Sequence, residues 1–127
     1  MKRVVILGAG TGGTIMANRI WSQHKKEVAA GEMTITVVDQ DNRHIYQPGL
    51  LFIPFDMYAP KDTIKKRKPF LPKAADFVVG VIDRVEVEED KVYLTNGMIL
   101  DDDMLIIATG ARLAPDESEG LMGPGWG

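Results

Sequence analysis

A glycine-rich turn directly after a short apolar run is the feature that most constrains the fold of this chain. The run is Val4-Val5-Ile6-Leu7, and Gly8-Ala9-Gly10-Thr11-Gly12-Gly13 follows it and matches the pattern G-x-G-x-x-G. A helix-competent stretch from Thr14 to about Val28 comes next, and a second strand-like run from Met33 to Val38 then ends in Asp39. Strand, glycine turn, helix, strand and terminal acid together predict a βαβ unit that binds a dinucleotide.

Each position of the turn has a physical role in such a unit. Gly8 allows the tight turn out of the strand, Gly10 lets a pyrophosphate approach the backbone, and Gly13 lets the helix pack close to the strands. The first amides of the helix lack intrahelical partners and point at the bound phosphates. Asp39 would accept hydrogen bonds from ribose hydroxyls and repel a 2′-phosphate, which favours FAD or NAD over NADP. The alternative is a glycine turn in an unrelated α/β protein.

The later hydrophobic patterns predict two kinds of strand. The continuous apolar runs 76–80 and 103–108 are typical of buried parallel strands. Residues 81–100 instead alternate between apolar and charged positions and contain the hairpin turn Asn96-Gly97. We therefore predict an α/β fold, with a Rossmann-like parallel sheet and an inserted three-stranded antiparallel meander. The parallel strands are expected near residues 3–8, 33–39, 76–80 and 103–108. Between them we predict a polar turn at 40–44, a short helix at 49–53 that Pro54 limits, and a surface helix at 59–68.

Composition narrows the class of protein. The 127 residues allow one domain, and the net charge of −3 argues against broad nucleic-acid binding. The absence of cysteine excludes a disulfide, a thiolate zinc site and a thiol nucleophile in this chain. No apolar run reaches about 18 residues, so no transmembrane helix is expected, and a cytoplasmic location is the default. Neither His44 nor Asp101-Asp102-Asp103 has the surroundings of a metal site, and we expect no metal.

The order of these elements is similar to the FAD-binding domain of the pyridine nucleotide–disulfide oxidoreductase superfamily. The fingerprint, Asp39, the meander and the strand Leu105–Gly110, which ends in Ala-Thr-Gly, carry the resemblance. Within the superfamily, the segment His44–Leu51 resembles the sulfide:quinone oxidoreductase branch, as do Phe70-Leu71-Pro72 and Gly123-Pro124-Gly125-Trp126. Type II NADH:quinone dehydrogenases carry a similar Gln-Pro-Leu-Leu loop and are the alternative.

The resemblance implies FAD as the cofactor. It places Ala108-Thr109-Gly110 near the FAD pyrophosphate, the backbone of Val81 near adenine, and Arg43 and Gln47 near the flavin phosphates. The residues expected to bind the cofactor are Gly8, Gly10, Thr11, Gly12, Gly13, Asp39, Gln40, Arg43, Gln47, Val81, Ala108, Thr109 and Gly110. Electrons would pass from sulfide, or from NADH, through FAD to quinone, and no catalytic residue is expected within this chain.

The resemblance also implies that the chain is an N-terminal fragment of a longer flavoenzyme, inactive alone. Residues 1–113 would form the first part of the FAD-binding domain, and residues 114–127 an irregular tail. A stand-alone nucleotide-binding module is a further alternative. Exposed apolar residues of the segment 50–55 would favour self-association as a homodimer or larger species. We interpret Lys65-Lys66-Arg67-Lys68 as a solvated face, with peripheral contact of the parent enzyme to an anionic membrane as the alternative.

Overall fold

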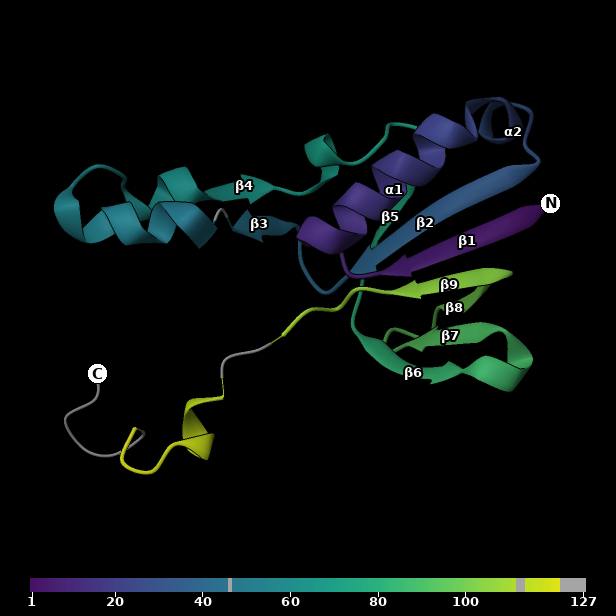
Figure 1. Ribbon diagram of the computed structural model, residues 1–127. Coiled ribbons are helices and arrows are strands. Elements are labelled where there is room, and N and C mark those ends of the chain that lie inside the picture. Colours follow the sequence, from purple (N-terminus) through teal and green to yellow (C-terminus); the bar gives the residue numbers. More distant parts are fainter. Residues whose placement is uncertain (46, 112–113, 122–127) are drawn as a thin grey trace.

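A four-stranded parallel sheet lies at the centre of the computed structural model, which describes residues 1–45, 47–111 and 114–121 (Figure 1). Its strands are β1 (Lys2–Leu7), β2 (Met33–Asp39), β5 (Asp76–Val79) and β9 (Met104–Ile107), in the order β5-β2-β1-β9. All three neighbouring pairs are parallel. The predicted α/β class and its four parallel strands are confirmed. The burial expected for 76–80 and 103–108 is not: β5 and β9 are only partly buried, because they are the two edge strands of the sheet.

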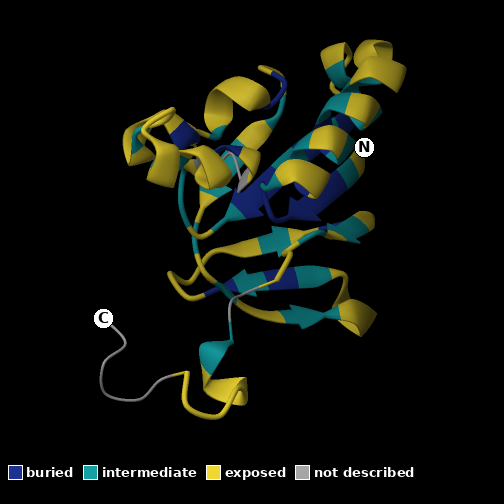
Figure 2. Ribbon diagram, turned by 60° about the vertical axis from the view of Figure 1, so that its left-hand side comes forward, coloured by how far each residue is buried: buried dark blue, intermediate teal, exposed yellow. Residues whose placement is uncertain are grey.

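Helices and a second sheet cover the two faces of this central sheet. Helix α1 (Thr11–Gln23) and the short α2 (Lys25–Ala29) lie on one face, in place of the single helix expected at 14–28. The other face carries the antiparallel sheet of β6 (Ile82–Glu86), β7 (Lys91–Leu94) and β8 (Ile99–Asp101), in sequential order. The three layers are visible in Figure 2, and the predicted meander is confirmed.

The central strand β1 supplies both layers of the core. Val4 and Ile6 pack in the helix-side cluster with Ala17 of α1. Val5 and Leu7 point the other way and pack with β7 in the meander-side cluster. Successive side chains of a strand face opposite sides, so a strand covered on both faces must be apolar at every position. This explains why Val4-Val5-Ile6-Leu7 does not alternate with polar residues.

The glycine turn joins β1 to α1 at very close range. Gly8 has φ = +103°, a conformation that L side chains rarely adopt. A Cβ placed on Gly13 would overlap the carbonyl oxygen of Gly8, and a Cβ on Gly8 would overlap the carbonyl oxygen of Ala108. The turn therefore packs backbone against backbone, and α1 begins at Thr11, three residues earlier than expected.

Between β2 and β5 the chain forms an arm that local patterns did not predict. The expected polar turn is confined to residues 40–42, because residues 43 and 44 belong to a strand, and the surface helix expected at 59–68 is wrong. Strand β3 (Arg43–Ile45) pairs antiparallel with β4 (Ile64–Lys66), and this pair projects from the body of the molecule (Figure 1). Tertiary pairing here overrides the helical preference of a lysine-rich segment.

Short 3₁₀ helices fill the rest of the arm: η1 (Gln47–Phe55), η2 (Pro60–Thr63) and η3 (Lys68–Phe70). The helix expected at 49–53 is thus a 3₁₀ helix that extends one residue beyond Pro54. Leu51 and Phe55 of η1 are each 74% exposed. They are candidates for the predicted self-association, which stays a prediction.

Two further segments are η4 (Val87–Glu89), between β6 and β7, and η5 (Pro115–Glu117), after β9. The domain boundary expected at residue 113 lies outside the described residues, as does the end of the expected tail, 122–127. Within the described ranges, no helix combines the length and the apolar character needed to cross a membrane.

An ion pair joins the beginnings of β1 and β9. The Arg3 guanidinium donates to the Asp103 carboxylate over 3.0 Å, and the Arg3 amide donates to the same oxygen over 2.7 Å. These bonds lower the pKa of Asp103 to about 2. Its neighbour Asp102 is buried, and burial raises the pKa of that carboxyl. The acidic run expected to be a simple turn therefore contains a link across the sheet.

The close packing of Gly13 predicts a difference between two neighbouring glycines of α1. Gly13→Ala should lower the free energy of unfolding by about 1–3 kcal/mol, because its Cβ has no space beside Gly8. Gly12→Ala is the matched control: its nearest neighbour would be the Ala108 Cβ at 3.9 Å, and the change should be neutral or stabilise by up to about 1 kcal/mol. Urea unfolding measures both, and equal effects would contradict the packing.

The Arg3–Asp103 link predicts a pH-dependent contribution to stability. Because the folded pKa of Asp103, about 2, lies below its ordinary value of 3.8, the stabilisation is fully present above about pH 4 and is lost as the pH falls toward 2. Asp103→Asn should therefore lower the free energy of unfolding at pH 7, and the difference from the parent should narrow between pH 4 and pH 2. Urea unfolding at several pH values tests this, and a constant difference over that range would contradict it.

Candidate functional site

A pocket lies at the carboxyl ends of the parallel strands. Its volume is about 230 Å³, and it is lined by Gly8, Val38, Asp39, Gln40, Gly80, Val81, Ile82 and Thr109. These residues come from the ends of β1 and β2 and from the segments that follow β5 and β9. The chain reverses its direction of travel across the sheet at β1, with β2 and β5 on one side and β9 on the other. Such a switch point is where open α/β sheets bind ligands.

Backbone hydrogen bonds hold the strand ends around this pocket. The Gly8 amide donates to the Val38 carbonyl over 2.7 Å, and the Gly80 amide donates to the Asp39 carbonyl over 2.8 Å. Of the residues expected to bind the cofactor, Gly8, Asp39, Gln40, Val81 and Thr109 line the pocket. Residues separated by up to 101 positions in sequence (8 and 109) therefore meet in one place.

The remaining fingerprint residues form the N-terminus of α1 beside the pocket. The first intrahelical bond runs from the Thr14 amide to the Gly10 carbonyl, over 3.0 Å. The amides of Thr11, Gly12 and Gly13 precede it, so helix geometry gives them no acceptor within α1. A Cβ placed on Gly10 would meet nothing within 4 Å, so the space above this residue is open. Amide donors, a helix dipole and open space together suit an anion.

Ala108 and Gly110 lie on the other side of the turn. The Ala108 amide donates to the Leu7 carbonyl over 2.7 Å, which extends the β1–β9 pairing by one residue. The Ala108 carbonyl contacts Gly8 so closely that Gly8 has no room for a side chain. Gly110 has φ = +74°, so the chain turns sharply away from the sheet at this residue. Thr109, which lies between them, is the residue of Ala-Thr-Gly that lines the pocket.

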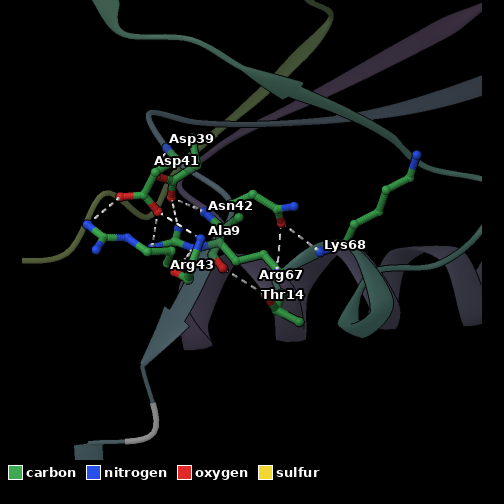
Figure 3. Close-up of polar contacts among 8 residues, drawn as sticks. All are labelled: Ala9, Thr14, Asp39, Asp41, Asn42, Arg43, Arg67 and Lys68. Atoms are coloured by element: carbon green, nitrogen blue, oxygen red, sulfur yellow. Dashed lines mark hydrogen bonds and ion pairs between the residues drawn. The ribbon is translucent and has the colours of Figure 1, made fainter. Parts of the chain in front are cut away.

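Asp39 connects the glycine turn to the arm. Its Oδ2 atom accepts a hydrogen bond from the Ala9 amide over 2.8 Å and another from Nη1 of Arg67 (Figure 3). The Asp39 side chain is only 14% exposed. The Oδ1 atom receives a long contact from the Asp41 amide, at 3.4 Å, among the residues described. One carboxylate oxygen is therefore anchored, and the other retains most of its capacity to accept.

Arg67 is a site residue that sequence reasoning missed. We expected the run 65–68 to be a solvated face, and this is correct for Lys65 and Lys66, which are exposed. The Arg67 side chain is instead 16% exposed and forms an ion pair with Asp39. The pairing of β3 with β4 brings it there from 28 positions away. No local pattern marks one cation among four neighbours as a partner of a distant acid.

Two of the expected residues, Arg43 and Gln47, belong to the arm. The Arg43 side chain is 67% exposed and lies 3.8 Å from an Asp41 oxygen, and Arg43 does not line the pocket. Its backbone carbonyl accepts a hydrogen bond from Nε of Arg67. Gln47 begins η1, and its side chain lies outside the described part of the chain.

Two sequence relatives match nearly the whole chain. The mitochondrial sulfide:quinone oxidoreductase of Dictyostelium discoideum is 31% identical over 121 residues, which cover 95% of this chain and 26% of the relative. The apoptosis-inducing factor homolog A of the same organism is 31% identical over 118 residues, 90% of this chain and 25% of the relative. The chain thus spans about a quarter of these proteins. No protein-family model matches it. Since the first relative is mitochondrial, the cytoplasmic location stays a prediction.

Solved structures share the fold. The sulfide:quinone oxidoreductase of Aquifex aeolicus superposes with a TM-score of 0.73 at 20% identity, over 90% of this chain and 25% of that one. NDH2 of Plasmodium falciparum, solved in complex with NADH, superposes with a TM-score of 0.68 at 20% identity. The superposition covers 89% of this chain and 23% of NDH2. Together with the sequence relatives, these structures confirm the predicted resemblance: the chain is similar to the sulfide:quinone oxidoreductases and has the fold of the pyridine nucleotide–disulfide oxidoreductases.

Proposed function

We propose that this chain is the FAD-binding segment of a flavin-dependent oxidoreductase of the sulfide:quinone oxidoreductase type. The observation that carries the proposal is the meeting of Gly8, Asp39, Val81 and Thr109 in one pocket beside the open N-terminus of α1. An acid, a phosphate cradle and an apolar wall are the three features that a bound adenine dinucleotide requires.

The dimensions of the site fit one end of such a ligand. At about 230 Å³ the pocket is smaller than the roughly 300–1,000 Å³ of complete ligand pockets, so it suits the adenosine end of a dinucleotide. Asp39 would receive the ribose hydroxyls, and the amides of Thr11 to Gly13 would face the pyrophosphate across the open space above Gly10. Gly80 and Val81 would border the adenine.

The hydrogen-bonding groups of the site favour a ribose without a 2′-phosphate. The Asp39 carboxylate lies in the pocket wall, where it could accept hydrogen bonds from ribose hydroxyls but not from a 2′-phosphate, which has only acceptor oxygens. Because Arg67 offsets its charge, this difference in hydrogen bonding, more than repulsion, supports FAD or NAD over NADP. The relation to oxidoreductases supports a redox dinucleotide. When bound, FAD would supply the electron-carrying chemistry. The residues of this chain would bind it and orient it.

Two alternatives remain open. The fold likeness to NDH2 in complex with NADH supports an FAD-binding segment of a type II NADH:quinone dehydrogenase-like enzyme. A nucleotide-binding module that is not itself an enzyme is the second alternative, since one relative of equal identity is named an apoptosis-inducing factor homolog and not an oxidoreductase. Sulfide or NADH as electron donor, quinone as acceptor, and peripheral membrane contact are proposals for a full-length parent. Paired cysteines in that parent would favour the sulfide enzyme.

The phosphate cradle predicts a specific loss of binding in Gly10→Val. The added side chain would occupy the space reserved for the pyrophosphate, and its Cβ would have no protein atom within 4 Å. We expect at least about a tenfold weaker affinity for FAD and ADP, equivalent to ~1.4 kcal/mol. Titration calorimetry measures the affinity and circular dichroism checks the fold. Ser22→Val, at an exposed position near the other end of α1, serves as the control. Equal uptake by parent and variant would show that the phosphates bind elsewhere.

The composition of the chain predicts that the purified chain does not catalyse quinone reduction by itself. It has no cysteine to attack or carry sulfur, and it spans about a quarter of its relatives. We therefore expect no sulfide- or NADH-dependent reduction of a soluble quinone by the purified chain with added FAD, measured from quinone absorbance. A full-length sulfide:quinone oxidoreductase is the positive control. Sustained turnover by the chain itself would overturn the interpretation that it is a binding segment.

A further inference from the structure

We propose that Arg67 is a positioning residue of the nucleotide site, which holds the Asp39 carboxylate in the orientation that receives the ribose hydroxyls. This inference rests on the proposed nucleotide site, because it assigns a role within it. Three observations support it. The Arg67 backbone is hydrogen-bonded to the loop after β2, and the Arg67 side chain forms an ion pair with Asp39. The two carboxylate oxygens of Asp39 also differ in how many hydrogen bonds they accept.

The backbone of Arg67 is attached to the loop that follows Asp39. The Arg67 amide donates to Oδ1 of Asn42 over 2.9 Å, and the Lys68 amide donates to the same oxygen over 3.3 Å (Figure 3). The Arg67 amide also lies 3.3 Å from the Asn42 carbonyl oxygen. One asparagine side chain thus closes the end of β4 onto the loop after β2 and sets where the Arg67 side chain begins.

The guanidinium group of Arg67 contacts the same loop through all three of its nitrogen atoms. Nε donates to the Arg43 carbonyl, Nη1 donates to Oδ2 of Asp39, and Nη2 lies 3.6 Å from an oxygen of Asp41. These partners span only five residues, 39 to 43. The planar guanidinium has five N–H donors in a fixed fork, so these bonds define its orientation as well as its position.

The two oxygens of Asp39 have different surroundings. Oδ2 is anchored by the Ala9 amide and by Arg67, which are strong bonds because the acceptor is charged. Oδ1 has only the long contact from the Asp41 amide among the described residues, and Asp39 lines the pocket. The terminal torsion of an aspartate is broad and roughly two-fold. Anchoring Oδ2 from two sides therefore presents Oδ1 to a ligand without further ordering of the side chain.

Comparison of ADP with 2′,3′-dideoxy-ADP isolates this role. The two probes have the same adenine and diphosphate, so their affinity ratio reports the ribose hydroxyls alone. The parent chain should bind ADP at least about tenfold more tightly than dideoxy-ADP. A difference of about tenfold is the contribution expected from one hydrogen bond to a charged acceptor. In Arg67→Gln the ratio should fall to within about threefold, while the affinity for dideoxy-ADP changes by less than about twofold. Arg67→Lys, which keeps the charge but not the fork, should lie between.

A double-mutant cycle separates action through Asp39 from direct contact with the ligand. Asp39→Asn should lower the ratio, and Asp39→Asn with Arg67→Gln should lower it no further, because Arg67 acts through the carboxylate. Lys65→Gln removes an exposed cation from the same segment and is the matched control, with an unchanged ratio. Titration calorimetry on the full 127-residue chain gives all the affinities, and urea unfolding confirms that each variant is folded. If Arg67→Gln does not fold, Arg67→Lys decides: a ratio below that of the parent supports the proposal, and an unchanged ratio overturns it.

Several outcomes overturn the proposal. An unchanged affinity ratio in the Arg67 variants would show that the Asp39 carboxylate is oriented without Arg67. An equal loss for both probes would show that Arg67 acts on the phosphates or only on the fold. A ratio near one in the parent would overturn ribose recognition by Asp39, and with it the role of Arg67, while leaving the nucleotide site itself intact. Binding of neither probe to the folded parent would instead refute the proposed nucleotide site, and the positioning role would fall with it.

Discussion

Direct backbone packing at the glycine turn determines how β1, α1 and β9 meet, and with it the position of the pocket. Gly13 lies against the Gly8 carbonyl, and Gly8 lies against the Ala108 carbonyl, in both cases too closely for a side chain. These contacts bring the N-terminus of α1, the end of β1 and the end of β9 to the same point. The open amides of the helix can face the crevice at the switch point only because nothing larger than hydrogen separates these three elements.

Asp39 both links separate segments of the fold and lines the pocket. Its carboxylate accepts from the Ala9 amide in the glycine turn and from Arg67 at the end of the arm. Its backbone carbonyl receives the Gly80 amide from the segment after β5. A single residue therefore ties the turn, the arm and the adjacent strand together around the pocket. Removing a partner from such a cluster leaves a poorly solvated charge unpaired, which costs more than the bond itself contributes.

Local sequence patterns predicted the elements that are defined by short-range rules. The continuous apolar run of β1 reflects burial on both faces, and Asn96-Gly97 marks the hairpin between β7 and β8. The run of β9 is equally apolar, but this edge strand is only partly buried. The pairing of β3 with β4 escaped prediction, since both strands have only three residues and neither has a distinctive pattern. The charged run before Pro69 suggested a helix, whereas pairing with a distant segment supplies its hydrogen bonds instead.

Residue spacing and glycine stereochemistry were enough to predict the βαβ unit, the four parallel strands, the meander and the acid at the end of β2. The fold was needed to show that Arg67 is the cation among residues 65–68 that is largely buried against Asp39, and that Arg43 lies outside the pocket wall. The difference lies in the range of the interactions. A glycine turn acts over a few residues, whereas the Asp39–Arg67 pair forms only after β3 and β4 have closed a long loop.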